Sequence, residues 1–420
     1  MSFARSYLKT GFLLFAACFL FVSLANALID PFGLFQFVSV SNINEKKPVM
    51  ETRQRLSKAY ITRMLKPGVV VLGNSIAEIG FDMKSHVGWQ RDGHRYNLGL
   101  TGVSLTELVK YLEHTIVTGN LKSAVLVADL RFFNKLWREQ PGFDASRLAT
   151  ESNGLGDVST ILSDLVSVLF SWDAIESSVQ TVRQQKIGAH NFDLNTGHRL
   201  FIENKLNAPR QKFVNGEVMT YAPPPEFGFS YVDSKTGRTS WDDLSRILDL
   251  ANRFDVSLHI VIPPVHASML AAMSVAGFWE LSEDWKRKLV RAVLEYRQKN
   301  PDAADTPIWD FSGFHRIALE PLPPVGGVRV MTWFVDNVHF SPPVGTAIID
   351  RIFASEPDTS EFIEFGIRLN ERTLDGHLVE LRRGVSKYMQ NNPAVVSELE
   401  EIFEVAGKSR PCGAIRCRVE

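Results

Sequence analysis

The chain has 420 residues, of which 45% are hydrophobic, so it can bury one large core or two modest ones. Its 46 basic and 47 acidic residues nearly cancel, and it has no basic stripe, Arg-rich run or zinc-finger spacing, which argues against a nucleic-acid partner. It has no fixed-period repeat or low-complexity tract, and no Cys or His pair at ligand spacing other than Cys412 and Cys417. We therefore expect a globular protein without a metal or cofactor.

The first predicted element is an apolar segment near the N-terminus. No charged residue occurs between Lys9 and Asp30, which matches the roughly 20 residues needed to cross a bilayer core. Arg5 and Lys9 precede the segment, so the positive-inside rule predicts a cytoplasmic N-terminus. We interpret residues 1–30 as a cytoplasmic tip and signal anchor of a single-pass inner-membrane protein whose main domain is periplasmic or extracellular. A cleaved signal peptide is the alternative, because Ala25-Asn26-Ala27 resembles a cleavage site; both interpretations export the domain.

Beyond this segment, short apolar runs alternate with segments of helical period, which is typical of a largely parallel sheet covered by helices. The expected strands are 69–72, 96–98, 124–129, 257–262 and 307–310. The expected helices are 104–118, 240–254, 282–298 and 343–353, with Ser240 as the cap of the second. The pattern predicts an α/β fold, with a three-layer α/β/α flavodoxin-like sheet of about five parallel strands in a domain over 31–356.

The alternation fails between residues 139 and 234. One helix is predicted there at 157–185, followed by a stretch rich in Pro, Gly and Asn. We expect an insertion that either covers the site, as a lid or a substrate-specific wall, or only supports the domain.

The C-terminal part, 357–420, is expected to be a helical extension ending in a polar tail. Its segment 360–403 is charged and amphipathic, which favours a packing or partner surface. In the tail, Cys412 and Cys417 are either bonded to each other or free thiols.

Three residues at widely separated positions suit nucleophilic catalysis. Ser75 follows an apolar strand, and Asp336 lies three residues before His339. A serine hydroxyl becomes nucleophilic when a neutral imidazole takes its proton, and the imidazole needs a carboxylate to fix its tautomer. Each fragment also has a purely structural interpretation, since the Ser or the preceding Asn can cap the next helix, and Asp-x-x-His is common by chance.

Other candidates follow the remaining strands, whose carboxyl ends bind ligands in sheets of this kind. Arg131 either binds an acidic sugar or phosphate or pairs with an acidic residue. His266 either contacts substrate or makes structural hydrogen bonds. Trp333, just before the Asp-His turn, either stacks on a sugar ring or belongs to the core.

The order of these motifs resembles that of the SGNH hydrolases, also called the GDSL family. Gly73-Asn74-Ser75 stands where the family has Gly-Asp-Ser, and Asp336-Asn337-Val338-His339 matches its Asp-x-x-His block. The family's glycine block is similar to the run from Tyr96 to Gly102.

The resemblance also bears on the oxyanion hole. It implies Gly99 or Gly102 as a backbone donor. The family's Gly-x-Asn-Asp block has no match here, so the asparagine donor stays open among Asn134, Asn97 and Asn74.

Within this superfamily the layout is most similar to membrane-anchored, exported proteins of envelope polysaccharide acylation, such as those of alginate O-acetylation and teichoic acid D-alanylation. The likeness lies in one N-terminal membrane segment, a junction at Asp30-Pro31-Phe32-Gly33-Leu34-Phe35, and then the serine strand. It implies an esterase or O-acyltransferase in which Ser75 attacks the ester of an acylated glycan, His339 acts as base and then acid, and Asp336 orients His339. The implied partners are an acylated glycan or acyl donor, the inner membrane and other polysaccharide-modification proteins. The competing interpretation is a catalytically inert binding or assembly protein of a polysaccharide apparatus.

Overall fold

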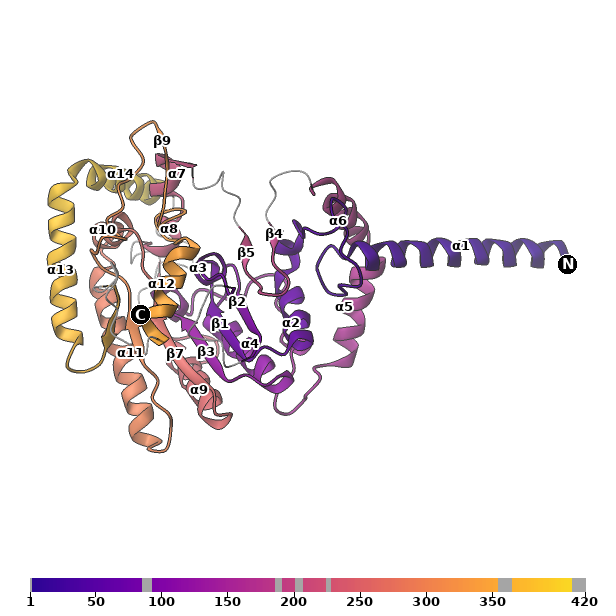
Figure 1. Ribbon diagram of the computed structural model, residues 1–420, viewed down its shortest axis with the longest axis horizontal. Coiled ribbons are helices and arrows are strands. Elements are labelled where there is room, and N and C mark those ends of the chain that lie inside the picture. The colour runs from indigo at the N-terminus through magenta and orange to yellow at the C-terminus, as the bar shows by residue number, and fades with distance from the viewer. Residues whose placement is uncertain are drawn as a thin grey trace.

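A computed structural model describes residues 2–84, 93–185, 191–200, 207–223, 228–353 and 365–409. Figure 1 shows a single body from which the N-terminal part of helix α1 (Ser2–Ile29) projects as a rod. This helix is long and apolar enough to span a membrane, consistent with a single-pass anchor.

The central sheet has six strands within the described residues, in the order β10-β8-β7-β3-β1-β2. Their bounds are Val69–Gly73 (β1), Arg95–Gly99 (β2), Ser123–Val127 (β3), Ser257–Ile262 (β7), Ile308–Asp310 (β8) and Ile367–Leu369 (β10). Five of them, β1, β2, β3, β7 and β8, pair in parallel. They confirm the five predicted strands with ends that differ by two residues at most. Strands β1 and β3 are buried along their whole length, which explains their continuous apolar runs.

The sixth strand, β10, was not predicted. It pairs antiparallel with β8 at the edge of the sheet, and only one of its three residues is buried. So short and exposed a strand carries almost no periodic signal. It lies beyond the predicted domain boundary at residue 356, so the C-terminal extension itself contributes to the sheet.

The predicted helices are present as α4 (Leu105–Thr118), α9 (Ser240–Arg253), α11 (Trp279–Lys299) and α12 (Pro342–Phe353). The predicted cap of α9 was wrong by one residue. Thr239 is the N-cap, because its hydroxyl accepts from the Asp242 amide while the Asp242 carboxylate accepts from the Thr239 amide. This reciprocal pair satisfies two amides, whereas the hydroxyl of Ser240 is buried inside the first turn.

The helices that flank the sheet form two packed groups. Helix α4 packs against α9 and against α2 (Gln54–Leu65), and α9 also packs against α11. The second group is α3 (Ser75–Gly80) with α12.

The insertion contains two helices where one was predicted. The helix expected at 157–185 is divided into α5 (Val158–Phe170) and α6 (Trp172–Arg183), because Ser171 is extended and its hydroxyl caps α6. Both helices pack against α1. The remaining elements are short: β4 (Asn191–Phe192), β5 (Arg199–Leu200), β6 (Asn207–Pro209), α7 (Arg210–Asn215) and α8 (Val218–Tyr221).

The end of the described chain forms α13 (Leu374–Asn391) and α14 (Pro393–Ser409), which pack against α10 (Ala267–Val275). In Figure 1 they lie at the end of the body opposite α1. Cys412 and Cys417 lie outside the described residues, as do residues 354–364 at the start of the predicted extension. Short elements complete the description: η1 (Met50–Arg53), η2 (Leu130–Phe133), η3 (Ala145–Arg147) and β9 (Val328–Val330).

Candidate active site

Ser75 is the first residue of helix α3, directly after strand β1. Asn74 caps this helix, since its side-chain oxygen accepts from the Ile76 amide at 2.9 Å. A residue at the first position of a helix has no partner for its own amide within the helix. The strand-to-helix turn thus presents both the Ser75 hydroxyl and its backbone N–H at the carboxyl end of the sheet.

Asp336 and His339 share one tight turn between Phe334 and Phe340. One carboxylate oxygen of Asp336 accepts from the amides of Val338 and His339, both at 2.8 Å, and so closes the turn. The other oxygen contacts His339 Nδ1 at 2.8 Å. A single aspartate therefore shapes the turn and orients the imidazole.

Close packing between α3 and α12 brings this turn to the serine. A side chain at Gly345 would meet the carbonyl oxygen of Gly80 at 2.0 Å, and one at Gly80 would meet the ring of Phe340 at 2.1 Å. The Phe340 ring also packs edge-on against Phe81. Two glycines thus allow the helix that follows His339 to lie directly on the helix that starts with Ser75.

The three predicted catalytic residues form one hydrogen-bonded chain. His339 Nε2 lies 2.8 Å from Ser75 Oγ, and the imidazole is only 5% exposed. Since Asp336 accepts at Nδ1, the neutral imidazole carries its proton there and offers Nε2 as the acceptor for the serine proton. Such a chain can move the hydroxyl proton of Ser75 onto His339.

The charges around the imidazole favour its protonated form. Burial lowers the pKa of His339, but the carboxylates of Asp336 and Glu217 outweigh it, and the net pKa is raised above its ordinary value. Burial also raises the pKa of Asp336, but the His339 charge and hydrogen bonds outweigh it, so that the net pKa is lowered. Asp336 therefore stays ionised and stabilises an imidazolium.

Tyr221, from the insertion, reaches the same site and was not anticipated from the sequence. Its hydroxyl lies 3.5 Å from Ser75 Oγ and accepts from Asn74 Nδ2 at 3.2 Å. Its ring meets the His339 ring edge-on. Burial raises the pKa of Tyr221, so the hydroxyl remains a neutral O–H donor beside the nucleophile. No local motif marks this tyrosine, because it comes from a four-residue helix.

Arg131 is buried beside Tyr221 without an ion pair among the described residues. Its guanidinium stacks over the rings of Tyr221 and Trp137, at 4.5 and 4.6 Å from their centroids. The side chain is 9% exposed, and its Nε and Nη2 have no hydrogen-bond partner in the described part of the chain. It lines a cavity of about 70 Å³ that also borders Ile76 and Asp129.

Of the two glycines proposed as oxyanion donors, Gly99 has its amide already engaged. The Gly99 amide donates to Asn97 Oδ1 at 2.9 Å, so it is already used at the end of β2. Gly102 has a positive φ of 66°, and its carbonyl accepts from the Trp137 indole. For Gly99 the expectation conflicts with this hydrogen bond, because one amide hydrogen cannot also point at Ser75.

Each asparagine left open by the sequence holds the backbone or the site together. Asn134 fixes the loop at 228–230, with its oxygen accepting from Ser230 and its nitrogen donating to the Gly228 carbonyl. Asn97 donates to one carbonyl within α3 and to the carbonyl just after it, and Asn74 donates to Asp129 and Tyr221. The amide hydrogens of Asn134 and Asn97 thus serve local structure.

His266 has a structural role. Its Nδ1 accepts from the Ser268 amide at 3.0 Å and caps α10, and its Nε2 contacts the Glu320 carbonyl at 2.7 Å. The ring is 1% exposed and burial lowers its pKa to about 4, so it remains neutral. A ring with both nitrogens occupied offers substrate no polar atom, which favours the structural alternative for His266.

Trp333 is half-buried and packs against the main core. Its backbone amide donates to Glu320 at 3.0 Å, which supports the turn that carries Asp336 and His339. Its sugar-stacking role stays a prediction. Within the described ranges, no group of three His, Cys, Asp or Glu residues is placed to hold a metal ion.

No protein-family model matches this chain, and no curated protein matches it significantly.

Proposed function

We propose that this protein is an exported, membrane-anchored serine esterase or O-acyltransferase that acts on an acylated envelope or exopolysaccharide glycan. The observation that carries the proposal is the hydrogen-bond chain from Ser75 through His339 to Asp336, with both links at 2.8 Å. The strand order supports a flavodoxin-like, three-layer arrangement of the SGNH type, because the parallel strands run 2-1-3-4-5 when numbered along the chain. The glycan substrate rests on the motif resemblance.

In the proposed mechanism, Ser75 Oγ attacks the ester carbonyl carbon while its proton moves to His339 Nε2. The tetrahedral intermediate collapses as His339 returns that proton to the leaving alcohol, which leaves an acyl-serine. Water or a sugar hydroxyl then attacks the acyl carbon, gives its proton to His339, and releases the acid or the new ester as Ser75 takes the proton back. Hydrolase and transferase differ only in this acceptor.

Two donors are available for the oxyanion. The Ser75 amide, the first of α3, has no hydrogen-bond partner in the described part of the chain, and the hydroxyl of Tyr221 lies 3.5 Å from Ser75 Oγ. Because Asn74 Nδ2 donates to the Tyr221 oxygen, the phenolic hydrogen is free to point toward the reacting centre. Tyr221 thereby supplies the donor that the family's asparagine provides.

Arg131 extends the site toward an anionic group of the substrate. A buried guanidinium with two unused donors binds a carboxylate or phosphate strongly, because little water screens its charge. Replacing Arg131 with Met should lower kcat/KM for an acetylated uronate or an acetylated polyol phosphate by about 10- to 100-fold, or 1.4 to 2.7 kcal/mol. The neutral ester p-nitrophenyl acetate should change little. Which of the two charged esters loses more identifies the anion, and equal losses for all three esters would contradict the assignment.

Labelling with a fluorophosphonate tests the nucleophile directly. The reagent should modify the purified full-length chain at Ser75, and Ser75→Ala should abolish the labelling. Ser386→Ala is the matched control, because Ser386 lies exposed on α13 and should leave labelling unchanged.

A catalytically inert binding or assembly protein is the second candidate function. It is favoured by the engaged amide of Gly99 and by the missing asparagine of the family motif. A second experiment distinguishes it from the enzyme. Ser75→Ala and His339→Ala should each remove nearly all esterase turnover, and the double variant should be no worse than either. A folded chain without labelling or turnover, whose Ser75→Ala form still supports polysaccharide production in cells, would leave the inert assembly protein as the better explanation.

The proposed compartment follows from the flanks of α1. Arg5 and Lys9 precede the apolar span, so the N-terminus should stay in the cytoplasm and the catalytic domain should be periplasmic or extracellular. A C-terminal periplasmic reporter should be active, and the full chain should fractionate with membranes. Reporter activity in the cytoplasm would overturn the proposed compartment.

A further inference from the structure

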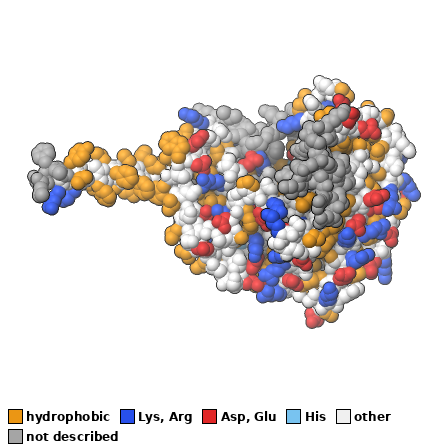
Figure 2. Space-filling view, turned by 180° about the vertical axis from the view of Figure 1, so that it is seen from behind, with side chains coloured by type: hydrophobic (Ala, Val, Ile, Leu, Met, Phe, Trp, Pro, Cys, Tyr) orange, Lys and Arg blue, Asp and Glu red, His pale blue; other side chains and the backbone are white. Residues whose placement is uncertain are grey.

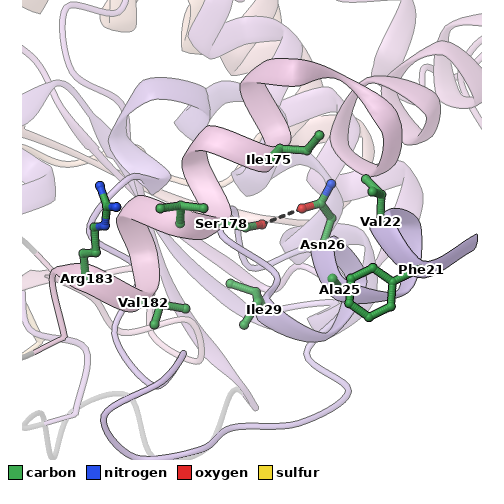
Figure 3. Close-up of a pocket in the computed structure, with 10 residues that line it drawn as sticks. Phe21, Val22, Ala25, Asn26, Ile29, Ile175, Ser178, Val182 and Arg183 are labelled. Atoms are coloured by element: carbon green, nitrogen blue, oxygen red, sulfur yellow. Dashed lines mark hydrogen bonds between the residues drawn. The ribbon is translucent and has the colours of Figure 1, made fainter. Parts of the chain in front are cut away.

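Helices α5 and α6 form a bent pair, residues 158–183, here called the elbow, that packs against helix α1. The ring of Phe19 in α1 stacks on Phe170 at the end of α5, with centroids 4.0 Å apart. Asn26 in α1 donates to the Leu169 carbonyl at 2.8 Å. It also accepts from the Ser178 hydroxyl at 2.8 Å (Figure 3). The polar side chain of Asn26 is thus satisfied by the elbow, which suits a site out of reach of water.

The position of these contacts along α1 places the elbow at membrane depth. Asp30 is the first charge after the apolar span, and its carboxylate accepts from three amides in the loop at 34–36. The Lys47 ammonium donates to the Ile29 carbonyl at 3.0 Å, so hydrogen bonds fix the end of α1 to the loop that follows it. At 1.5 Å per residue, Asn26 and Phe19 lie about 6 and 16 Å before Asp30, within a core about 30 Å thick.

The outer face of α5 is apolar and exposed. Val158, Leu162 and Val166 follow one another at intervals of four residues and are 60%, 56% and 57% exposed. Figure 1 shows α5 running across the direction of α1, and Figure 2 shows hydrophobic side chains continuing from α1 onto the adjoining edge of the body. A helix that lies in a membrane interface presents such a stripe to the lipid.

Two of the four charged residues of the elbow have ion-pair partners, whereas Glu176 and Arg183 on α6 are exposed. Asp164 on α5 forms an ion pair with Arg147 at 2.6 Å and faces the body. Asp173 on α6 pairs with Arg53, which also stacks over the Phe32 ring just after α1. Together α5 and α6 meet the length and hydropathy expected of a membrane span, although a bend of 54° divides them. Their contacts favour a shallow position over a crossing.

We propose that the elbow is buried in the membrane leaflet on the side of the main domain, with lipid acyl chains filling the groove between α1 and α6. This inference rests on the proposed membrane anchoring of α1. The groove has a volume of about 410 Å³ and is lined mainly by apolar residues of the two helices, including Phe21, Val22, Ala25, Val179 and Val182. The elbow holds the catalytic domain in a fixed orientation and brings its substrates close to the membrane surface.

Depth measurements on single spin labels test the proposal. Full-length protein with its three cysteines replaced by serine receives one cysteine at Val166, and is reconstituted as single copies in phosphatidylethanolamine/phosphatidylglycerol nanodiscs. Val379→Cys is the matched control, because Val379 is 48% exposed on α13, far from α1. Phe15→Cys within α1 reports separately on the membrane anchor.

We expect the label at Val166 to be more accessible to oxygen than to a water-soluble nickel chelate, with a depth of about 5 to 10 Å, and the label at Val379 to show the reverse. Nickel accessibility at Val166 equal to that at Val379 would overturn the proposal. Shielding of Val166 from both reagents would also overturn it, because protein and not lipid would then cover the stripe. If Phe15 is open to nickel, the anchoring itself fails.

Discussion

The hydroxyl of Tyr221 is the most informative single group to remove. Tyr221→Phe keeps the ring, so the stacking on Arg131 and the edge contact with His339 both remain. The variant loses only an O–H that lies 3.5 Å from Ser75 Oγ and the acceptor of one hydrogen bond from Asn74. Any change in rate therefore reports on the hydroxyl itself.

Two magnitudes separate a catalytic hydroxyl from a structural one. Removing one oxyanion donor lowers kcat by about 100- to 1,000-fold. The cost in stability should be about 1 kcal/mol, because Asn74 keeps its hydrogen bond to Asp129. We therefore expect a large loss of kcat with little change in KM or in the urea midpoint.

The assay is hydrolysis of p-nitrophenyl acetate by the purified full-length protein, with urea unfolding followed in parallel. Tyr231→Phe is the control, since the Tyr231 hydroxyl is buried without a hydrogen-bond partner among the described residues. Its removal should leave both rate and stability nearly unchanged. If Tyr221→Phe retains more than about a third of the wild-type kcat, which is far from the loss expected for an oxyanion donor, the assignment is refuted.

The remaining expectations concern pH, orientation and stability. Because the pKa of His339 is raised, the neutral base is lost as pH falls, and kcat/KM should decline on the acid side with an apparent pKa above 6.5. Glu217→Gln removes one of the carboxylates that raise this pKa, so it should shift the acidic limb of the pH profile to lower pH. An unchanged limb in the pH profile of Glu217→Gln would contradict the electrostatic argument. Asp336→Asn should lower kcat by up to roughly ten-thousand-fold, because the amide favours the wrong tautomer, and retention of wild-type kcat would count against the triad. Lys58→Met should cost about 1 to 3 kcal/mol in urea unfolding, since the buried Glu78 carboxylate loses the nearer of its two cations, at 3.0 Å, and keeps only Arg199 at 3.6 Å. A loss below about 0.5 kcal/mol would show that Arg199 alone compensates the Glu78 charge.

The sequence determined the features that depend on local pattern. Five parallel strands and four of the helices follow from short apolar runs and helical periodicity, because burial on both faces of a sheet demands continuous apolar residues. The candidate nucleophile, base and carboxylate were also visible, since Asp336 and His339 lie in one turn and Ser75 ends a strand. Their roles remain predictions, but the choice of residues needed no tertiary information.

Tertiary structure alone decided how these groups meet and what surrounds them. The approach of α12 to α3 depends on Gly345 and Gly80, which are 265 positions apart and carry no signal until they touch. Tyr221 enters from an insertion without periodicity, and the amide of Gly99 is engaged by a side chain two residues earlier. Which donor pairs with which acceptor depends on their distance in the folded chain, and local sequence does not encode that distance. The sequence could therefore name the reacting groups, whereas only the packed fold could assign their partners.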